Sequence, residues 1–213
     1  MSRTEIITNF SNLLLIINII IYVQYLFRNK KILNVFSFYL LFIGFIQAYM
    51  SILFHLGINN LFLSHYYFIG QFLVLTLFYY RILQSKIFKK VVLIILPLTI
   101  LLTIISLVNN PITDDQFNTI EVLVTSVPII LFSVFYFIEN LDNIKGYLLI
   151  NSGIFLYLAS STFLFAAGNF VNDSESIFRK KYVWDINASL YVVYQILIFI
   201  EWYKHFRKPE VPN

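Results

Sequence analysis

The sequence predicts an all-α membrane protein with seven transmembrane helices, and three observations lead to this fold class. Of the 213 residues, 59% are hydrophobic and only 12% are charged, whereas a soluble domain carries about 25% charged residues. The mean hydropathy is +0.78. Seven apolar stretches also reach or approach the length of about 20 residues that a helix needs to cross the hydrocarbon core. Lipid is therefore the solvent that this composition suits.

The seven predicted spans follow one another through short connections. No connection is long enough for a soluble domain, so we expect residues 1–213 to form a single transmembrane domain. Pro97 and Pro128 fall inside the fourth and fifth spans, where proline is tolerated because neighbouring groups satisfy the freed backbone carbonyl. The predicted spans are Ile6–Phe27, Val35–Gly57, Leu61–Leu83, Val91–Val108, Asn118–Ile138, Tyr147–Phe170 and Tyr182–Tyr203.

Neutral polar side chains inside the spans share helix faces. Asn18, Tyr22 and Tyr25 lie on one face of the first span. A face of the last span carries Asn187, Tyr191, Tyr194 and Gln195, and the second and third spans hold Gln47 and Gln71. We interpret these faces as interhelical seams, where amides and hydroxyls bond across helices. A polar permeation path is the alternative. The small residues of the sixth span, such as Gly153, favour close helix approach.

The distribution of Lys and Arg predicts the orientation. With the amino terminus outside, eleven of the fifteen basic residues fall in inner segments and four in outer segments. Short cytoplasmic loops carry the excess of basic residues, so the amino terminus is expected outside and the carboxyl terminus in the cytoplasm. Trp184 and Trp202 are 18 residues apart in the last span. That separation is about 27 Å along a helix, so the two rings are expected at opposite interfaces.

Five side chains at the outer ends of the spans are candidate ligand-binding residues: His55, His65, Glu121, Asp185 and Asn187. Ionisable groups in transmembrane segments often mark functional sites, and clefts between the helices of a bundle often bind ligands. The alternative for each residue is interface anchoring or helix-to-helix hydrogen bonding. For Asp185 a further alternative is capping of the first turn of its helix.

Several classes of function are disfavoured. The chain has no Cys and its three His lack metal-ligand spacing, so we expect no metal site, no cofactor and no enzymatic centre. The basic residues lie in short clusters between apolar runs, which argues against a nucleic-acid partner. The last span has no Lys before Lys204, which excludes a retinal Schiff base in mid-span. No acid or base is expected at the membrane midplane, where proton-coupled transport usually places one.

Three stretches carry a resemblance to a known group of proteins. They are FYYRILQSKIFKK (78–90), INSGIFLYLASSTFLFAAG (150–168) and WDINASLYVVYQILIFIEW (184–202). Over much of 65–204 the chain resembles uncharacterised bacterial seven-helix integral membrane proteins associated with two-component sensor kinases. The resemblance implies a sensing role in the bacterial inner membrane, with a cytoplasmic sensor kinase as the partner.

The function expected from the sequence is an integral membrane sensory or coupling module. It has a polar pocket on the outer side, and it acts through a cytoplasmic sensor kinase or other membrane subunits, because the inner loops are too short to carry a signal themselves. One alternative is a small-solute transporter. The other is a structural subunit that assembles through the small residues of the sixth span.

Overall fold

The computed structural model describes residues 3–27, 31–109, 118–141, 146–170 and 176–206, without the side chains of 109, 166–170 and 176–181. The described part is helical and contains no strand. Its helices are α1 (Arg3–Val23), α2 (Lys31–His55), α3 (Leu63–Ile82), α4 (Lys86–Asn109), α5 (Thr119–Glu139), α6 (Leu148–Phe170) and α7 (Ser176–Glu201). A 3₁₀ turn (Gln24–Phe27) follows α1 and a π-helical turn (Trp202–Phe206) follows α7.

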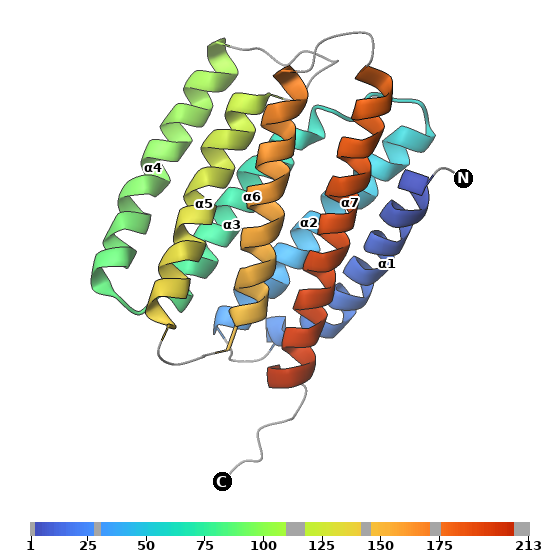
Figure 1. Ribbon diagram of the computed structural model, residues 1–213. Helices are drawn as coiled ribbons and strands as arrows, with labels where there is room; N and C mark the ends of the chain where they lie inside the picture. Colours follow the sequence, from blue (N-terminus) through green and yellow to red (C-terminus); the bar gives the residue numbers. More distant parts are fainter. Residues whose placement is uncertain (1–2, 28–30, 110–117, 142–145, 171–175, 207–213) are drawn as a thin grey trace.

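The all-helical prediction is confirmed, and six of the helices are long and apolar enough to cross a membrane. The protein is therefore a multi-pass membrane protein by the length and composition of its helices. The exception is α3, whose 20 residues include His65, Gln71 and Arg81. It nevertheless runs beside the other helices in Figure 1.

The last helix begins earlier than the sequence predicted. The first residue of α7 is Ser176, whereas the predicted span began at Tyr182. At the other end, the π-helical turn continues the helix to Phe206. Residues 179–181 therefore lie within a helix, although their side chains lie outside the description. Asp185 sits well past the first turn, where a side chain no longer reaches free N–H groups. The expectation that Asp185 caps the start of its helix is therefore wrong.

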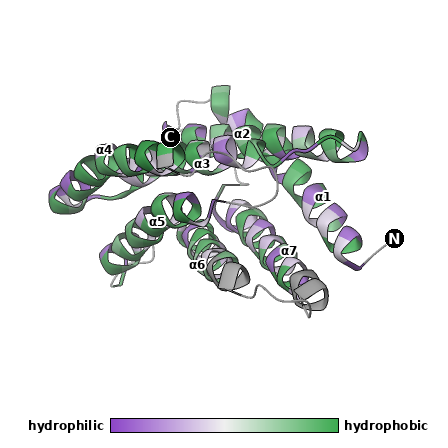
Figure 2. Cartoon of the chain, turned by 90° about the horizontal axis from the view of Figure 1, so that it is seen from above, coloured by the Kyte–Doolittle hydropathy of each residue, from purple (hydrophilic) through white to green (hydrophobic). Residues whose placement is uncertain are grey.

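Six helices form a closed ring. Neighbouring pairs are α1–α2, α2–α3, α3–α5, α5–α6, α6–α7 and α7–α1, and α4 lies outside the ring against α3 and α5. Figure 2, which looks along the bundle, shows α4, α3 and α2 along one side, with α5, α6 and α7 along the other. We call the end at which α1, α3, α5 and α7 begin the amino end, and the opposite end the carboxyl end.

Aromatic side chains fill the ring towards the carboxyl end. Tyr22 of α1 packs edge-on against Phe36 of α2, with ring centroids 5.4 Å apart. Phe36 in turn lies 5.3 Å from Phe78 of α3. Tyr79 of α3 lies 6.2 Å from Phe132 of α5. Aromatic pairs contribute about 0.5–1.5 kcal/mol each beyond the area that they bury, so this chain of contacts links four helices.

Glycines allow two close helix contacts. A Cβ on Gly153 would lie 2.6 Å from Cδ2 of Tyr194, where α6 meets α7. A Cβ on Gly70 would lie 2.1 Å from Cζ of Phe42, where α3 meets α2. Both distances are too short for a real side chain, so these helices approach as closely as they do only because glycine is present. The small-residue contact predicted for Gly153 is therefore confirmed.

The polar faces predicted as interhelical seams on the first and last spans meet each other, which confirms that interpretation for these two helices. Nδ2 of Asn18 donates to the Gln195 carbonyl at 2.9 Å and to Gln195 Oε1 at 2.8 Å. The Tyr22 hydroxyl donates to the Ile198 carbonyl at 3.1 Å, and the Tyr25 hydroxyl to the Phe206 carbonyl at 2.8 Å. These bonds join the two ends of the chain along the seam.

Two carboxylates at the carboxyl end receive backbone N–H groups from the starts of other helices. Glu201 is fully buried and accepts from Tyr147 N at 2.8 Å and Leu149 N at 2.6 Å, at the start of α6. Glu139 accepts from Gln84 N at 2.8 Å and Ser85 N at 2.7 Å, just before α4. Both satisfy N–H groups that a helix start leaves free, and their charge favours the positive end of the helix dipole.

We predict that Glu201→Ala lowers the free energy of unfolding by about 3 kcal/mol or more. The variant loses two hydrogen bonds to a charged acceptor, each worth roughly 1.5–3 kcal/mol, and leaves two N–H groups unpaired. Unfolding of the purified protein in sodium dodecyl sulfate measures the change. The matched control is His205→Ala, because His205 Nε2 lies 3.7 Å from Glu201 Oε1 on a side chain that is 44% exposed. That variant is expected to cost less than about 1 kcal/mol. Equal stability of the two variants would contradict the capping role.

Candidate functional site

His65 and Glu121 meet at the amino end, where α3 and α5 begin. His65 Nδ1 contacts Glu121 Oε2, and the two side chains are 11% and 1% exposed. Asn118 positions this turn of α5, because its Oδ1 accepts from Glu121 N at 3.2 Å. Its Nδ2 donates to Ser106 Oγ of α4 at 3.2 Å. Three helices thus hold the carboxyl group against the imidazole.

The His65–Glu121 pair is only partly satisfied. Glu121 Oε1 is buried and has no hydrogen-bond partner. Leaving such an atom unpaired typically costs about 1–3 kcal/mol, so the site favours any group that can donate a hydrogen bond to Glu121 Oε1. In the described part of the chain, no three His, Cys, Asp or Glu residues lie close enough to hold a metal ion.

Asp185 lies at a different contact of the amino end. It is 8% exposed, and its Oδ1 accepts a hydrogen bond from the Thr4 hydroxyl of α1. It therefore joins α7 to the first helix of the chain. Since α7 neighbours neither α3 nor α5, the structure does not bring Asp185 to the His65–Glu121 pair.

His55 does not join the pair either. It is the exposed last residue of α2, and its Nδ1–H donates to the carbonyl of Ser51 in the same helix at 2.7 Å. Its ring also packs edge-on against that of Phe54, with centroids 5.8 Å apart. This side chain is thus bonded to its own helix end rather than to another candidate residue.

Asn187 faces the inside of the ring and belongs to a group that we call the tyrosine–amide cluster: Gln47, Tyr67, Tyr157, Asn187, Tyr191 and Tyr194. Gln47 Nε2 of α2 donates to the Tyr191 hydroxyl of α7 at 3.0 Å. The Tyr157 ring of α6 lies 5.1 Å from that of Tyr191 and stacks on that of Tyr194, with centroids 5.7 Å apart. The Tyr157 hydroxyl interacts with Asn187 and with Tyr67 of α3.

Four polar atoms of the cluster are buried and have no partner with hydrogen-bond geometry: Gln47 Oε1, Tyr67 OH, Asn187 Oδ1 and Tyr194 OH. Most buried polar groups in proteins are hydrogen-bonded, so a group of exceptions calls for an explanation such as an unseen water or ligand. The four atoms come from α2, α3 and α7. They include both donors and acceptors, and none of the six cluster side chains carries a charge at neutral pH.

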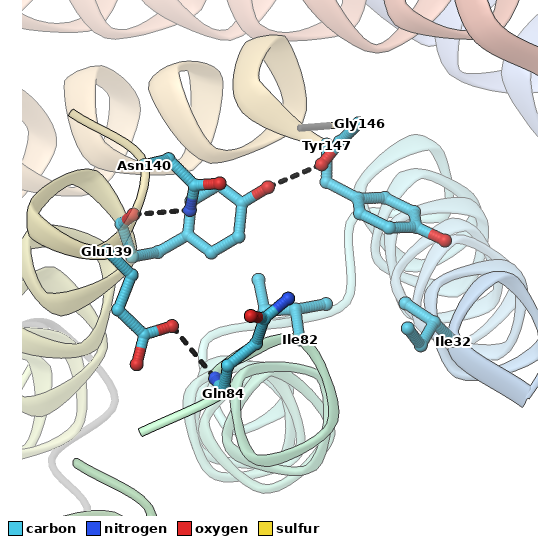
Figure 3. Close-up of a pocket in the computed structure, with 8 residues that line it drawn as sticks. Ile32, Ile82, Gln84, Glu139, Asn140, Gly146 and Tyr147 are labelled. Atoms are coloured by element: carbon cyan, nitrogen blue, oxygen red, sulfur yellow. Dashed lines mark hydrogen bonds between the residues drawn. The ribbon is translucent and has the colours of Figure 1, made fainter. Parts of the chain in front are cut away.

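A pocket of about 130 Å³ opens at the carboxyl end, between the start of α2, the ends of α3 and α5, and the residues before α6. Figure 3 shows its lining, which includes Ile32, Ile82, Gln84, Glu139, Asn140 and Tyr147. Tyr147 has a left-handed backbone with a φ of 78°, which is rare for a bulky residue. None of the five residues predicted from the sequence lines this pocket.

Sequence reasoning missed Tyr67, Tyr157, Glu139 and Asn140. The two tyrosines are ordinary in a chain with 15 Tyr and 23 Phe, so their type gave no signal. Glu139 and Asn140 follow the fifth predicted span and resembled loop residues. A carboxylate at the last residue of an apolar stretch was the available signal, since Glu201 occupies the same place at the end of α7.

No protein-family model, curated protein or solved structure matches this chain.

We predict that His65 and Glu121 are energetically coupled. His65→Phe and Glu121→Leu should each destabilise the protein by about 3 kcal/mol, because each leaves a buried partner alone. The double variant should lose clearly less than the sum, since it leaves no unpaired group. Unfolding in detergent measures all three. His55→Phe, at the same end of the bundle but bonded only to its own helix, should stay within about 0.5 kcal/mol of the native protein. Additive losses would show that the pair is not coupled.

Proposed function

We propose that the protein is a sensory or coupling module of the bacterial inner membrane that binds a small, uncharged polar ligand in the tyrosine–amide cluster. The observation that carries the proposal is a group of four buried polar atoms without a well-formed hydrogen bond, on three helices around one interior. Their nearest polar neighbours are other tyrosine hydroxyls and amides, such as Tyr157 beside Tyr67 and Asn187. Inside a membrane protein such atoms need a partner from elsewhere. A ligand with both donors and acceptors supplies it.

The charges around the cluster support an uncharged ligand. Asp185 already accepts from Thr4, and Glu121 is in contact with His65. The cluster itself offers only amides, phenol hydroxyls and aromatic rings, which recognise neutral polar groups and flat apolar faces. A charged ligand would meet no compensating charge among the six cluster residues, and its desolvation would oppose binding.

The orientation that we propose has seven spans, including α3, and the amino terminus outside. The described basic residues favour this orientation by six to four: Lys31, Arg81, Lys86, Lys89, Lys90 and Lys204 lie at the carboxyl end, whereas Arg3, Arg179, Lys180 and Lys181 lie at the amino end. Under the charge rule the carboxyl end then faces the cytoplasm. Gln47 and Tyr67 lie in the outer third of their helices and Asn187 lies in the first half of α7, so the ligand enters from outside.

The coupling route that we propose runs along α6 and α7. Tyr157 and Asn187 interact between these helices towards the amino end, and Glu201 of α7 holds the start of α6 at the carboxyl end. A ligand that changes the fit of α6 on α7 therefore also changes the position of Tyr147, which lines the pocket there. Because the connections are short, a cytoplasmic sensor kinase or another membrane subunit receives the change.

A small-solute transporter is the second candidate. It is favoured by the depth of the cluster, which extends from Asn187 to Tyr194 and continues to the seam between Gln195 and Asn18. The cluster lies in the middle of the ring, between the amino end and the pocket at the carboxyl end. Transport requires that a bound solute leave at the second end, whereas a sensor only binds and releases it at the first.

Thermal unfolding tests the ligand site. The purified protein is screened in detergent against monosaccharides, nucleosides and simple amides, each paired with a carboxylate or amine analogue. We predict that at least one uncharged solute raises the unfolding temperature by about 2–4 °C, which corresponds to roughly 1 kcal/mol for a chain of this size. The charged analogue should have a smaller effect. Failure of every neutral solute in the screen would count against the proposal.

The matched variants are Tyr67→Phe and Tyr66→Phe in α3. Tyr67 carries a buried hydroxyl that lacks a well-formed hydrogen bond, whereas the neighbouring Tyr66 is 63% exposed. Tyr67→Phe should abolish the shift and Tyr66→Phe should preserve it. The solute that binds is then offered, radiolabelled, to proteoliposomes that contain only this protein. Retention no greater than the binding capacity supports the sensor, and saturable accumulation inside the vesicles contradicts it in favour of the transporter.

A further inference from the structure

The pocket at the carboxyl end is a separate site of limited size. Its volume is about 130 Å³, close to the cavity of about 150 Å³ that binds benzene in another protein. It can therefore hold one small organic group, or the end of one side chain. It cannot hold a folded peptide.

Three of the hydrogen-bond donors around the pocket are already used. Nδ2 of Asn140 donates to the Tyr136 carbonyl at 2.7 Å. The Tyr136 hydroxyl donates to the Gly146 carbonyl, and Gln84 N donates to Glu139. Figure 3 draws these bonds along one side of the pocket. A carboxylate or phosphate would find these three donors occupied and would also face the negative charge of Glu139.

Acceptors, in contrast, remain available. Asn140 is 7% exposed, and its Oδ1 is buried without any hydrogen-bond partner. The half-buried Glu139 accepts one backbone N–H on each oxygen, and a carboxylate oxygen has a second lone pair for another donor. Glu139 forms no ion pair with a cation in the described part of the chain. The pocket thus combines an unsatisfied acceptor with a carboxylate that is offset by two backbone N–H groups and the start of α4 but by no described cationic side chain.

The remaining walls suit an apolar stem and a positive head. Ile32 and Ile82 give an aliphatic surface, and Tyr147 lies beside them in Figure 3. The left-handed backbone of Tyr147 is unfavourable for a residue with a Cβ, which comes close to the following carbonyl oxygen. It is held there by its N–H bond to Glu201 at 2.8 Å and by packing of its ring on Phe206. The aromatic ring is thus fixed at the pocket wall, where its face can attract a cation.

We infer that this pocket binds an organic cation with an ammonium or guanidinium head and a short apolar stem. The head donates to Asn140 Oδ1 and to Glu139, and the stem lies between the isoleucines. Lys31 and Arg81 stand nearby, but both are exposed, so water and salt screen their repulsion more than the attraction of the half-buried carboxylate. The site does not depend on the function proposed for the tyrosine–amide cluster.

Calorimetry with n-butylammonium tests the site. The comparison compounds are 1-butanol and butyrate, which have a similar alkyl chain but a neutral or a negative head group. We predict that the purified full-length protein binds n-butylammonium at least tenfold more tightly than 1-butanol, and that butyrate does not bind measurably. The positive head accounts for the difference, because it alone matches the acceptors. Binding of 1-butanol within twofold of n-butylammonium would overturn the inference.

Two variants locate the binding in the pocket. Ile32→Phe fills it from α2 and should weaken n-butylammonium binding at least tenfold, whereas Ile87→Phe, at the same end on a side chain that is 71% exposed, should leave binding unchanged. Glu139→Gln removes the charge and should also weaken binding tenfold, with thermal unfolding as the check that it still folds. Unchanged binding in Ile32→Phe would overturn the inference even if Glu139→Gln does not fold.

The same chemistry has two sources, a free amine or the side chain of a basic residue in a partner protein. N-acetyl-lysine amide separates them, because it presents the lysine head on a peptide backbone. Binding at least as tight as that of n-butylammonium indicates a partner's side chain. Much weaker binding indicates a free amine, because the peptide groups are then excluded. Failure of both probes to bind refutes the site.

Discussion

The rest of the structure depends on the contact between α1 and α7, because it closes the ring. Without it, the amide of Asn18, the hydroxyl of Tyr22 and the carboxylate of Asp185 would face lipid, where unsatisfied polar groups cost several kcal/mol each. With it, each has a partner on the opposite helix. Individual bonds between membrane helices contribute only about 0.6 kcal/mol on average. The contact between α1 and α7 is therefore stabilised by several hydrogen bonds spaced along the two helices. It is also stabilised because separating the helices would expose their polar groups to lipid.

Ionisable and neutral polar groups have different places in this bundle. Three carboxylates of the described residues lie near helix ends, where Glu139 and Glu201 receive backbone N–H groups and Glu121 meets an imidazole. The buried Asp185 lies farther along its helix and accepts from Thr4 of α1. The middle of the ring holds tyrosines and amides. A charge at the centre of a bilayer is costly, whereas an amide or phenol can be satisfied by a neighbour or a small ligand. This separation underlies the proposal of an uncharged ligand inside the ring and a charged one at its end.

Much of the fold could be read from the sequence, since apolar length alone gives the helices and their order. The polar face of Asn18, Tyr22 and Tyr25 predicted a seam correctly, because residues at helical spacing must share a partner. Which partner could not be read, since that depends on how the ring closes. For the same reason the sequence placed His55, Asp185 and the His65–Glu121 pair at one end of the bundle without separating them. The predicted capping role of Asp185 is wrong because α7 begins at Ser176, before the predicted start at Tyr182. The polar residues between these positions are helical, although their composition did not indicate it.

The position of α4 outside the ring has a consequence for how this protein can diverge. The other six helices must each fit two ring neighbours, with glycines and amides at fixed contacts, whereas α4 packs only on α3 and α5. The most apolar stretch of α4 has a mean hydropathy of 3.0, and 22% of its residues are buried. Selection there acts mainly on hydrophobicity, so Leu, Ile and Val can replace one another freely. In relatives of this chain α4 should therefore be among the least conserved helices in sequence, although its composition stays the same.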